Sequence, residues 1–349
     1  MSDDLEKLAP DRAVRMYLDA RRDELADWTL KSHKYRLGAF VQWCEENGID
    51  DLNDLTGRDL FEYRIWRREG NFDVEDGESP KAIAPVTLKT QLTTLRAFLR
   101  FAADVNAVPE DFYERVALPK ISGTADVSDS TINPDRAPAI LDYLHRYHYA
   151  SRRHVVFALL WETGARMGAI RGLDLRDLDL EGHNPIIQYV HRPETGTPIK
   201  NGYSGERHNA VSDRVGRMLQ AYIDGPRIDK RDENGRRPLL TTTQGRASTS
   251  TIRQDVYCVT RPCWIAKGCP HNRDMETCEA VPIGSSSKCP SSRSPHDVRK
   301  GVVTLYRREE VPRRVVSDRL DASDQVLDKH YDKRGERERA EQRRNHLPW

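Results

Sequence analysis

The feature that most constrains this chain is an apolar face repeated at helical spacing from Thr87 to about Val105. Its members recur three or four positions apart and are Leu88, Leu92, Leu95, Phe98, Leu99 and Ala102. This spacing predicts one broad side of a helix, which other elements must cover. Three earlier segments with helical spacing can cover it, at 12–26, 32–48 and 56–70. In the last, Thr56 and Asp59 stand three residues apart, as in a capping box. The sequence therefore predicts a small helical bundle at the start of the chain.

After a Pro-, Gly- and Ser-containing stretch, the pattern changes. Residues 121–133 are predicted to be a linker between two domains, 1–120 and 134–349. Helical spacing returns at 135–147, 151–163, 212–223 and 248–264. Two β-rich runs, I-I-Q-Y-V-H and E-R-H-N-A-V, flank a polar turn and predict an antiparallel hairpin. The predicted fold class is therefore mainly α, with a small antiparallel β-hairpin or sheet, in two domains.

Charge and hydropathy restrict the class of protein. Charged residues make up 32% of the 349, and no apolar run approaches the roughly 18 residues of a membrane span. With no signal peptide at the start, we expect a cytoplasmic protein without membrane contact. The net charge of +1 does not indicate nucleic-acid binding, so any such surface must arise from local clustering. Candidates for DNA contact in the first domain are Lys31, Lys34, Arg36, Lys89, Arg96 and Arg100. A solvated helix face explains them equally well.

Residue types suited to phosphate chemistry recur along the second domain. Arg166 closes T-G-A-R at the end of a predicted helix, and Lys200 is the only lysine in the hairpin turn. His296 and Arg299 stand in S-P-H-D-V-R, and Tyr331 lies in D-K-H-Y-D-K-R. An arginine offers two parallel donors to a phosphate and keeps its charge, whereas histidine can exchange a proton near neutral pH.

In this order and spacing, the residues resemble the tyrosine recombinases, the phage integrases and Xer-type recombinases. The resemblance covers nearly the whole chain. It implies a helical core-binding (SAM-like) domain followed by a catalytic domain. The stretch from Cys269 to Arg299 is most similar to integrases of halophilic archaea and their mobile elements. The family cleaves and rejoins strands of a specific double-stranded DNA site through a 3′-phosphotyrosyl intermediate. It assembles into multimers on DNA and needs no cofactor for catalysis.

The resemblance also implies roles for these residues. Arg166 and Arg299 would bind the non-bridging phosphate oxygens, and His296 would act as general acid–base. Lys200 would protonate the departing 5′ oxygen. Tyr331 would be the nucleophile, with Tyr306 as the alternative closer to His296. Arg171 competes with Arg166, although we expect it on an outer helix face.

One position departs from the family pattern. Nine residues before the tyrosine, where a second histidine or a tryptophan is usual, this chain has Ala322. Alanine has no side-chain donor for the phosphate. Either this contact is absent, or a nearby residue supplies it, with Ser323, Lys329 and His330 as the alternatives. Two other functions therefore stay open: a type IB topoisomerase-like enzyme that relaxes DNA, or a catalytically inactive, zinc-containing DNA-binding protein.

Five of the six cysteines fall between Cys258 and Cys289. In a cytosolic protein such clustering favours a metal over disulfides. We predict an insertion at 258–290 braced by a structural zinc. The predicted ligands are Cys263, Cys269, Cys278 and Cys289, with His271 as an alternative ligand. The spacing lacks C-x-x-C pairs, so ordinary free or buried thiols are the competing interpretation. A catalytic zinc is not expected.

Overall fold

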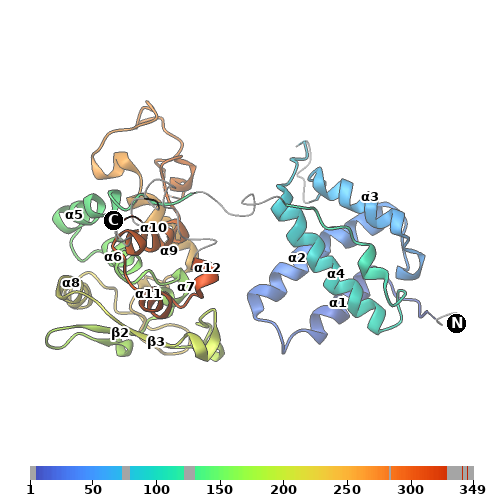
Figure 1. Cartoon of the computed structure of the whole chain (residues 1–349), viewed down its shortest axis with the longest axis horizontal. Coiled ribbons are helices and arrows are strands. Elements are labelled where there is room, and N and C mark those ends of the chain that lie inside the picture. Colours follow the sequence, from blue (N-terminus) through green and yellow to red (C-terminus); the bar gives the residue numbers. More distant parts are fainter. Residues whose placement is uncertain are drawn as a thin grey trace. The chain divides into compact units, whose positions relative to one another are not determined.

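A computed structural model describes residues 5–72, 79–121, 130–282 and 284–327, together with Ala340 and Arg344. The chain divides into two compact units, residues 1–126 and 127–349 (Figure 1). The division falls inside the segment expected to be a linker. Each unit has its own hydrophobic core, so each is described by itself.

Unit 1 is a helical bundle built around the predicted apolar face. Its helices are α1 (Pro10–Ala20), α2 (Asp27–Glu46), α3 (Gly57–Arg68) and α4 (Pro85–Asp104). Helix α4 contacts the other three and buries Leu92, Phe98 and Leu99 completely. The capping box of Thr56 and Asp59 forms at the start of α3. Helix α2, in contrast, begins five residues before the expected cap at Ser32, because 27–31 contain no Gly or Pro to prevent a helix.

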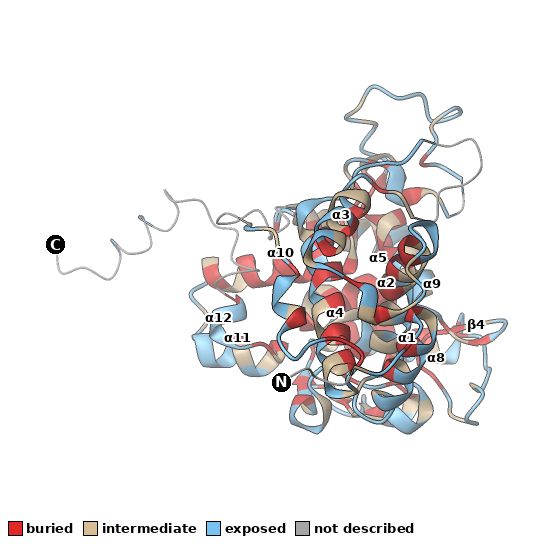
Figure 2. Ribbon diagram, turned by 90° about the vertical axis from the view of Figure 1, so that its right-hand side faces the viewer, coloured by how far each residue is buried: buried red, intermediate tan, exposed pale blue. Residues whose placement is uncertain are grey.

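Unit 2 is organised around one buried helix. The helices, in chain order, are α5 (Arg136–Tyr147), α6 (Arg152–Thr163), α7 (Met167–Gly172), α8 (Asp213–Asp224), α9 (Thr249–Val259), α10 (Pro295–Arg308), α11 (Arg313–Leu320) and α12 (Asp324–Val326). Helix α6 is buried from His154 to Leu160 and contacts α5 and each helix from α7 to α10. Figure 1 shows α10 beside it, and α10 is itself buried along most of its length, whereas α11 is largely exposed (Figure 2).

The small sheet of unit 2 has the predicted hairpin. Strands β1 (Leu178–Asp179), β2 (Ile186–Tyr189) and β3 (Arg207–Ala210) pair in the order β1-β2-β3, all antiparallel. A second ribbon pairs β4 (Thr241–Thr242) with β5 (Gly245–Arg246). The mainly helical fold with a small antiparallel sheet is therefore confirmed. None of the helices in the described part of the chain is both long and apolar enough to span a membrane.

Candidate active site

The first turn of α10 places His296 and Arg299. Ser294 caps the helix and forms a capping box with Asp297, and Pro295 occupies the first helical position. Arg299, one turn further, is 1% exposed, and its Nη1 donates to the carbonyl oxygen of Gly164 at 2.7 Å. This hydrogen bond joins two sequence motifs that lie 135 residues apart.

The T-G-A-R segment forms the turn between α6 and α7. Gly164 ends α6 in the left-handed region, with φ of 59°. A Cβ at this position would lie 2.1 Å from Leu320 Cδ2, so the turn requires glycine. Arg166 then stands at the N-cap of α7, two residues after the carbonyl that receives Arg299. The structure therefore brings the two predicted phosphate-binding arginines to one turn.

Arg166 has an acidic partner that sequence reasoning did not predict. Its Nη1 donates to both the main-chain oxygen of Asp321 at 2.7 Å and to Oδ2 of the same residue at 2.8 Å. Asp321 lies directly before Ala322. Two features of the sequence could have indicated this contact. Asp321 stands next to position 322, where a phosphate-binding donor was expected, and aspartate tolerates the left-handed backbone better than most residues.

Ala322 is buried in a small apolar cluster. This cluster consists of Val303, Val316, Leu320, Ala322 and Leu327. The Ala322 N–H also donates to the Ser317 carbonyl, and Ser317 Oγ donates to the Ala322 carbonyl at 2.8 Å. Of its predicted substitutes, Ser323 precedes α12, whereas Lys329 and His330 lie outside the described residues. Tyr331, the predicted nucleophile, also lies outside them.

The His296 side chain is exposed, and it stands among cations. Partial removal of the ring from water and, second, the charges of Lys300 and Arg299 lower the pKa of His296 to about 4. The imidazole is therefore neutral at physiological pH and can accept a proton. The charge of Asp297 acts in the opposite direction, toward a higher pKa of His296.

Lys200 lies exposed in the loop between β2 and β3. The next residue connects this loop to the arginine turn: Asn201 Nδ2 donates to Asp321 Oδ1 at 2.7 Å. Before the lysine, Ile199 is buried, and its N–H donates to His191 Nδ1 at 3.1 Å. The loop is thus held on both sides of Lys200.

A buried ionic cluster, here called the loop-base network, anchors the start of the same loop. Its members are Asp174, Asp177, Asp232, Arg192, Arg236 and Arg246. Arg236 donates to Thr197 Oγ1 at 2.9 Å and to the Thr195 carbonyl at 2.8 Å. Although burial alone would raise it, hydrogen bonds and charge from Arg246 hold the pKa of Asp232 below its usual range. The network is therefore charged and structural.

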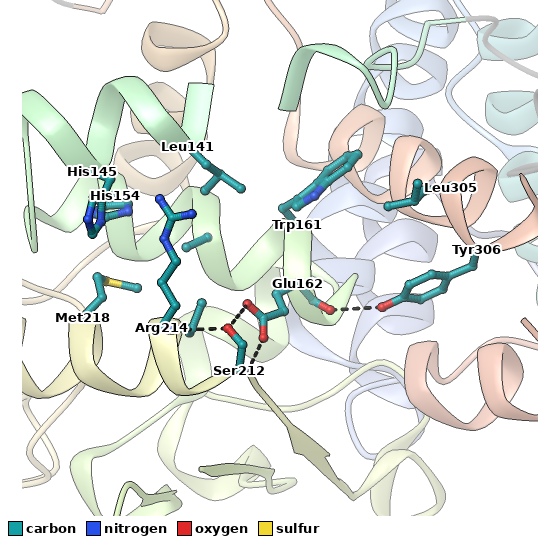
Figure 3. Close-up of a pocket in the computed structure, with 12 residues that line it drawn as sticks. Leu141, His145, His154, Trp161, Glu162, Ser212, Arg214, Met218, Leu305 and Tyr306 are labelled. Atoms are coloured by element: carbon teal, nitrogen blue, oxygen red, sulfur yellow. Dashed lines mark hydrogen bonds between the residues drawn. The ribbon is translucent and has the colours of Figure 1, made fainter. Parts of the chain in front are cut away.

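Tyr306, the alternative nucleophile, lines a separate pocket of about 360 Å³ between α5, α6, α8 and α10 (Figure 3). Its hydroxyl donates to the Glu162 carbonyl at 3.0 Å and accepts from Arg319 Nε at 3.1 Å. None of the other candidate catalytic residues in the described part of the chain lines this pocket. Tyr306 is thus engaged in packing between α10 and α6.

The six cations of unit 1 fall into different environments. Lys31, Arg36 and Lys89 line two adjoining hollows of about 490 and 510 Å³ between α2 and α4. Lys34 is exposed on α2. Arg96 instead donates to the Glu114 carbonyl at 3.2 Å, and Arg100 lies over the Tyr113 ring at 4.5 Å. The structure therefore gathers half of the predicted set along one groove.

The predicted zinc ligands do not form a metal-binding group. Cys263, Cys269, Cys278, Cys289 and His271 are all described, yet no three His, Cys, Asp or Glu side chains among the described residues are arranged to hold a metal ion. His271 Nε2 instead lies 2.9 Å from Ser291 Oγ. All six cysteines are free thiols. The donor geometry therefore does not fit the predicted site.

Comparisons with known proteins agree with this architecture. No protein-family model matches the chain. Tyrosine recombinase XerD of Mycobacterium tuberculosis (strain CDC 1551 / Oshkosh) is 28% identical over 165 residues, 46% of this chain and 51% of that protein. Tyrosine recombinase XerC of Escherichia coli O157:H7 (strain EC4115 / EHEC) is 23% identical over 193 residues, 55% of this chain and 60% of that protein. The chain thus spans about half the length of the curated relatives it matches.

Among solved structures, the Tn1549 transposon integrase in complex with transposon right-end DNA matches with a TM-score of 0.62. That match has 14% identity and covers 97% of this chain and all of that one. The fold is therefore that of the tyrosine-type integrases and recombinases. The XerD and XerC relatives are also tyrosine recombinases, so the similarities in sequence and in fold agree with the motif resemblance.

Proposed function

We propose that this chain is a site-specific DNA recombinase that cuts and rejoins strands through a 3′-phosphotyrosyl intermediate. The observation that supports it best is the hydrogen bond from Arg299 to the Gly164 carbonyl, two residues before Arg166. Two guanidinium groups anchored at one turn can bind the non-bridging oxygens of a phosphate and stabilise the charge of its pentacoordinate transition state.

In the proposed reaction, each group either forms a bond or transfers one proton. The Tyr331 phenol oxygen attacks the phosphorus, and the bond from phosphorus to the 5′ oxygen breaks. His296, neutral because its pKa is lowered to about 4, accepts the phenol proton. Lys200 gives a proton to the departing 5′ oxygen. A 5′ hydroxyl from another strand then attacks the phosphotyrosyl bond, and the same transfers run in reverse.

Double-stranded DNA is the proposed partner, and unit 1 is proposed as the core-binding domain. Side chains lining the α2–α4 hollows include Lys31, Arg36 and Lys89 and several threonines, and no carboxylate. Such a surface favours a phosphate backbone, because cations and hydroxyl groups are its usual ligands. Assembly of several protomers on paired sites follows from the need for a second strand. The Tn1549 integrase was solved with its DNA, which is consistent with this proposal.

Covalent capture tests the nucleophile. A suicide substrate, nicked so that the 5′ product diffuses away, should trap the full chain as an adduct that resists denaturation. The Tyr331→Phe variant should give none, while the Tyr306→Phe variant should keep it. An adduct that persists in Tyr331→Phe would refute the assignment. Relaxation of supercoiled plasmid without any site preference would instead favour the topoisomerase-like alternative.

The proposed chemistry needs no metal, because a tyrosine nucleophile and basic side chains supply every step. A structural zinc in the cysteine segment stays a separate prediction, which the described side-chain arrangement does not support. Elemental analysis of the purified protein tests it: about zero zinc per chain would end that prediction and leave the recombinase proposal intact.

A further inference from the structure

We infer that Asp321 is a positioning residue for the proposed reaction, because its hydrogen bonds fix the position of Arg166 relative to the loop that carries Lys200. This inference rests on the function proposed above. It concerns how the site is built, since Asp321 itself would not touch the reacting atoms.

Both oxygens of the Asp321 carboxylate are used, and by different parts of the chain. Oδ2 accepts from Arg166 Nη1 at 2.8 Å, and Oδ1 accepts from Asn201 Nδ2 at 2.7 Å. These partners lie 155 and 120 residues away in the sequence. The side chain is 12% exposed, so the charge is largely removed from water and its contacts are strong. One carboxylate thus joins the arginine turn to the hairpin loop.

The backbone at Asp321 is in an unfavourable conformation. Its φ of 52° and ψ of 58° place it in the left-handed region, where glycine is least strained. Asp and Asn enter this region more readily than other residues with side chains, but still at a cost. Backbone strain of this kind clusters at functional sites, and here the strained residue directs its carboxylate at a candidate catalytic arginine.

The geometry favours positioning over blocking. Asp321 contacts Arg166 through Nη1 alone, and no described residue takes a hydrogen bond from Nε or Nη2 of that arginine. The Arg166 side chain keeps 22% of its surface exposed. Nε and Nη2 form the edge that binds a phosphate with two parallel hydrogen bonds. A carboxylate acting as a phosphate mimic would occupy that edge, whereas Asp321 leaves it available.

Nearby packing also depends on this placement. A Cβ at Gly205, at the far end of the β2–β3 loop, would lie 3.1 Å from Asp321 Oδ2. Arg207 Nε and Asn209 Nδ2 both donate to the Arg319 carbonyl, at 2.9 and 3.2 Å. The end of α11 is therefore seated on the hairpin, and the carboxylate is held where both partners reach it.

The test compares Asp321→Asn with Asp321→Gly in the full chain. Both replacements suit the left-handed backbone, so loss of activity should not reflect misfolding. The rate of adduct formation at saturating suicide substrate should fall about tenfold to a hundredfold, because a misplaced arginine loses transition-state contacts. DNA affinity should change by less than about threefold, since binding away from the reacting phosphate is untouched. Asp318→Asn, at an exposed position of the same helix, is the matched control and should leave both values unchanged.

A double-mutant comparison separates positioning from general damage. If Asp321 acts partly through Arg166, Asp321→Asn should slow the Arg166→Ala protein by a smaller factor than it slows the wild type, and the remaining factor measures its effect on the Lys200 loop. Equal rates for wild type and both Asp321 variants would overturn the inference. So would faster reaction or tighter DNA binding in Asp321→Asn, which would mark a carboxylate that competes with phosphate. Absence of any adduct with wild-type protein would instead reject the proposed function itself.

Discussion

Arginines occur in two contrasting settings in unit 2. In the loop-base network, Arg246 meets Asp232 at 2.8 Å and also contacts Asp174, and all three side chains are 6% exposed or less. Arg166 meets one carboxylate through one nitrogen and stays partly exposed. Arg246 forms ion pairs with two buried carboxylates, so its role is to stabilise the loop. Arg166 pairs with one carboxylate through one nitrogen, so its remaining N–H groups can bind an incoming anion.

The largest expected effect is a loss of stability when an arginine of the loop-base network is replaced. Arg246→Ala leaves Asp174 and Asp232 buried with Arg236 as the remaining cation that both contact, at 3.8 and 3.1 Å. The free energy of unfolding should therefore fall by about 3 kcal/mol, the lower end of the range for a broken buried ion pair. Urea denaturation measures it. Arg176→Ala is the control, because Arg176 reaches Asp174 at 3.6 Å from an exposed position and should cost less than about 1 kcal/mol. A loss in Arg246→Ala as small as that of the control would contradict the structural role.

The next largest effect is on the reaction rate when Arg166 is replaced. Arg166→Ala should slow adduct formation about a hundredfold to a thousandfold, because it removes a preorganised cation from the transition state. Stability should change little, since Asp321 keeps Asn201 as a partner. The control is Arg171→Ala, five residues on, whose Nη1 donates to the Gly196 carbonyl at 3.1 Å. If both variants slow the reaction equally, the distinction between the two arginines fails.

The lowered pKa values of two histidines predict how stability depends on pH. Burial lowers the pKa of His154 to about 4, and partial removal from water together with neighbouring cations lowers that of His296 to about 4 as well. Both are neutral in the folded chain, whereas in the unfolded chain they titrate near 6.5. The unfolded state therefore binds more protons between pH 6.5 and 4, and stability should decrease as the pH falls through this window.

DNA should separate these two histidines. A bound phosphate would raise the pKa of His296 and leave that of His154 unchanged, because His154 accepts from the Ala150 N–H inside unit 2. Histidine NMR titrations of Tyr331→Phe, with and without duplex, measure both values. A His296 pKa that stays fixed under saturating DNA would place the phosphate elsewhere.

The smallest effect extends the comparison to unit 1. Lys31 and Lys89 line a groove whose described lining has no carboxylate, so they should contact phosphates. Replacing both with glutamine should lower the slope of log affinity against log salt by about 0.9 for each phosphate that is no longer neutralised. Arg100→Gln, in which a guanidinium stacked on Tyr113 is removed, should leave the slope nearly unchanged. Equal slopes in both variants would argue against the groove.

Local sequence signals predicted local structure well. The apolar face of α4, the capping box at Thr56, and the paired strands β2 and β3 each depend on residues close together in the chain. The glycine of T-G-A-R also has a local cause, because it ends α6 with a positive φ. These features recur wherever the same short patterns occur, so sequence alone was sufficient.

What sequence could not supply were partners far apart in the chain. Asp321 and Arg166 are 155 residues apart, and Asp174 and Arg246 are 72 apart, so no spacing rule links them. That Ala322 has no side-chain donor could be read from the sequence, but its packing with Val316 and Leu320 could not. The cysteines lie close together in the sequence, but among the described residues their side chains do not come together in a group that could hold a metal ion.

The link between Arg299 and Gly164 also has a consequence for timing. A chain emerging from the ribosome presents Arg166 long before Arg299 exists, and the two meet only once the last third of the sequence has been made. Truncated or nascent copies therefore carry half of the cation pair. Under the proposed function, an incomplete copy without Arg299 lacks one of the two cations that stabilise the transition state.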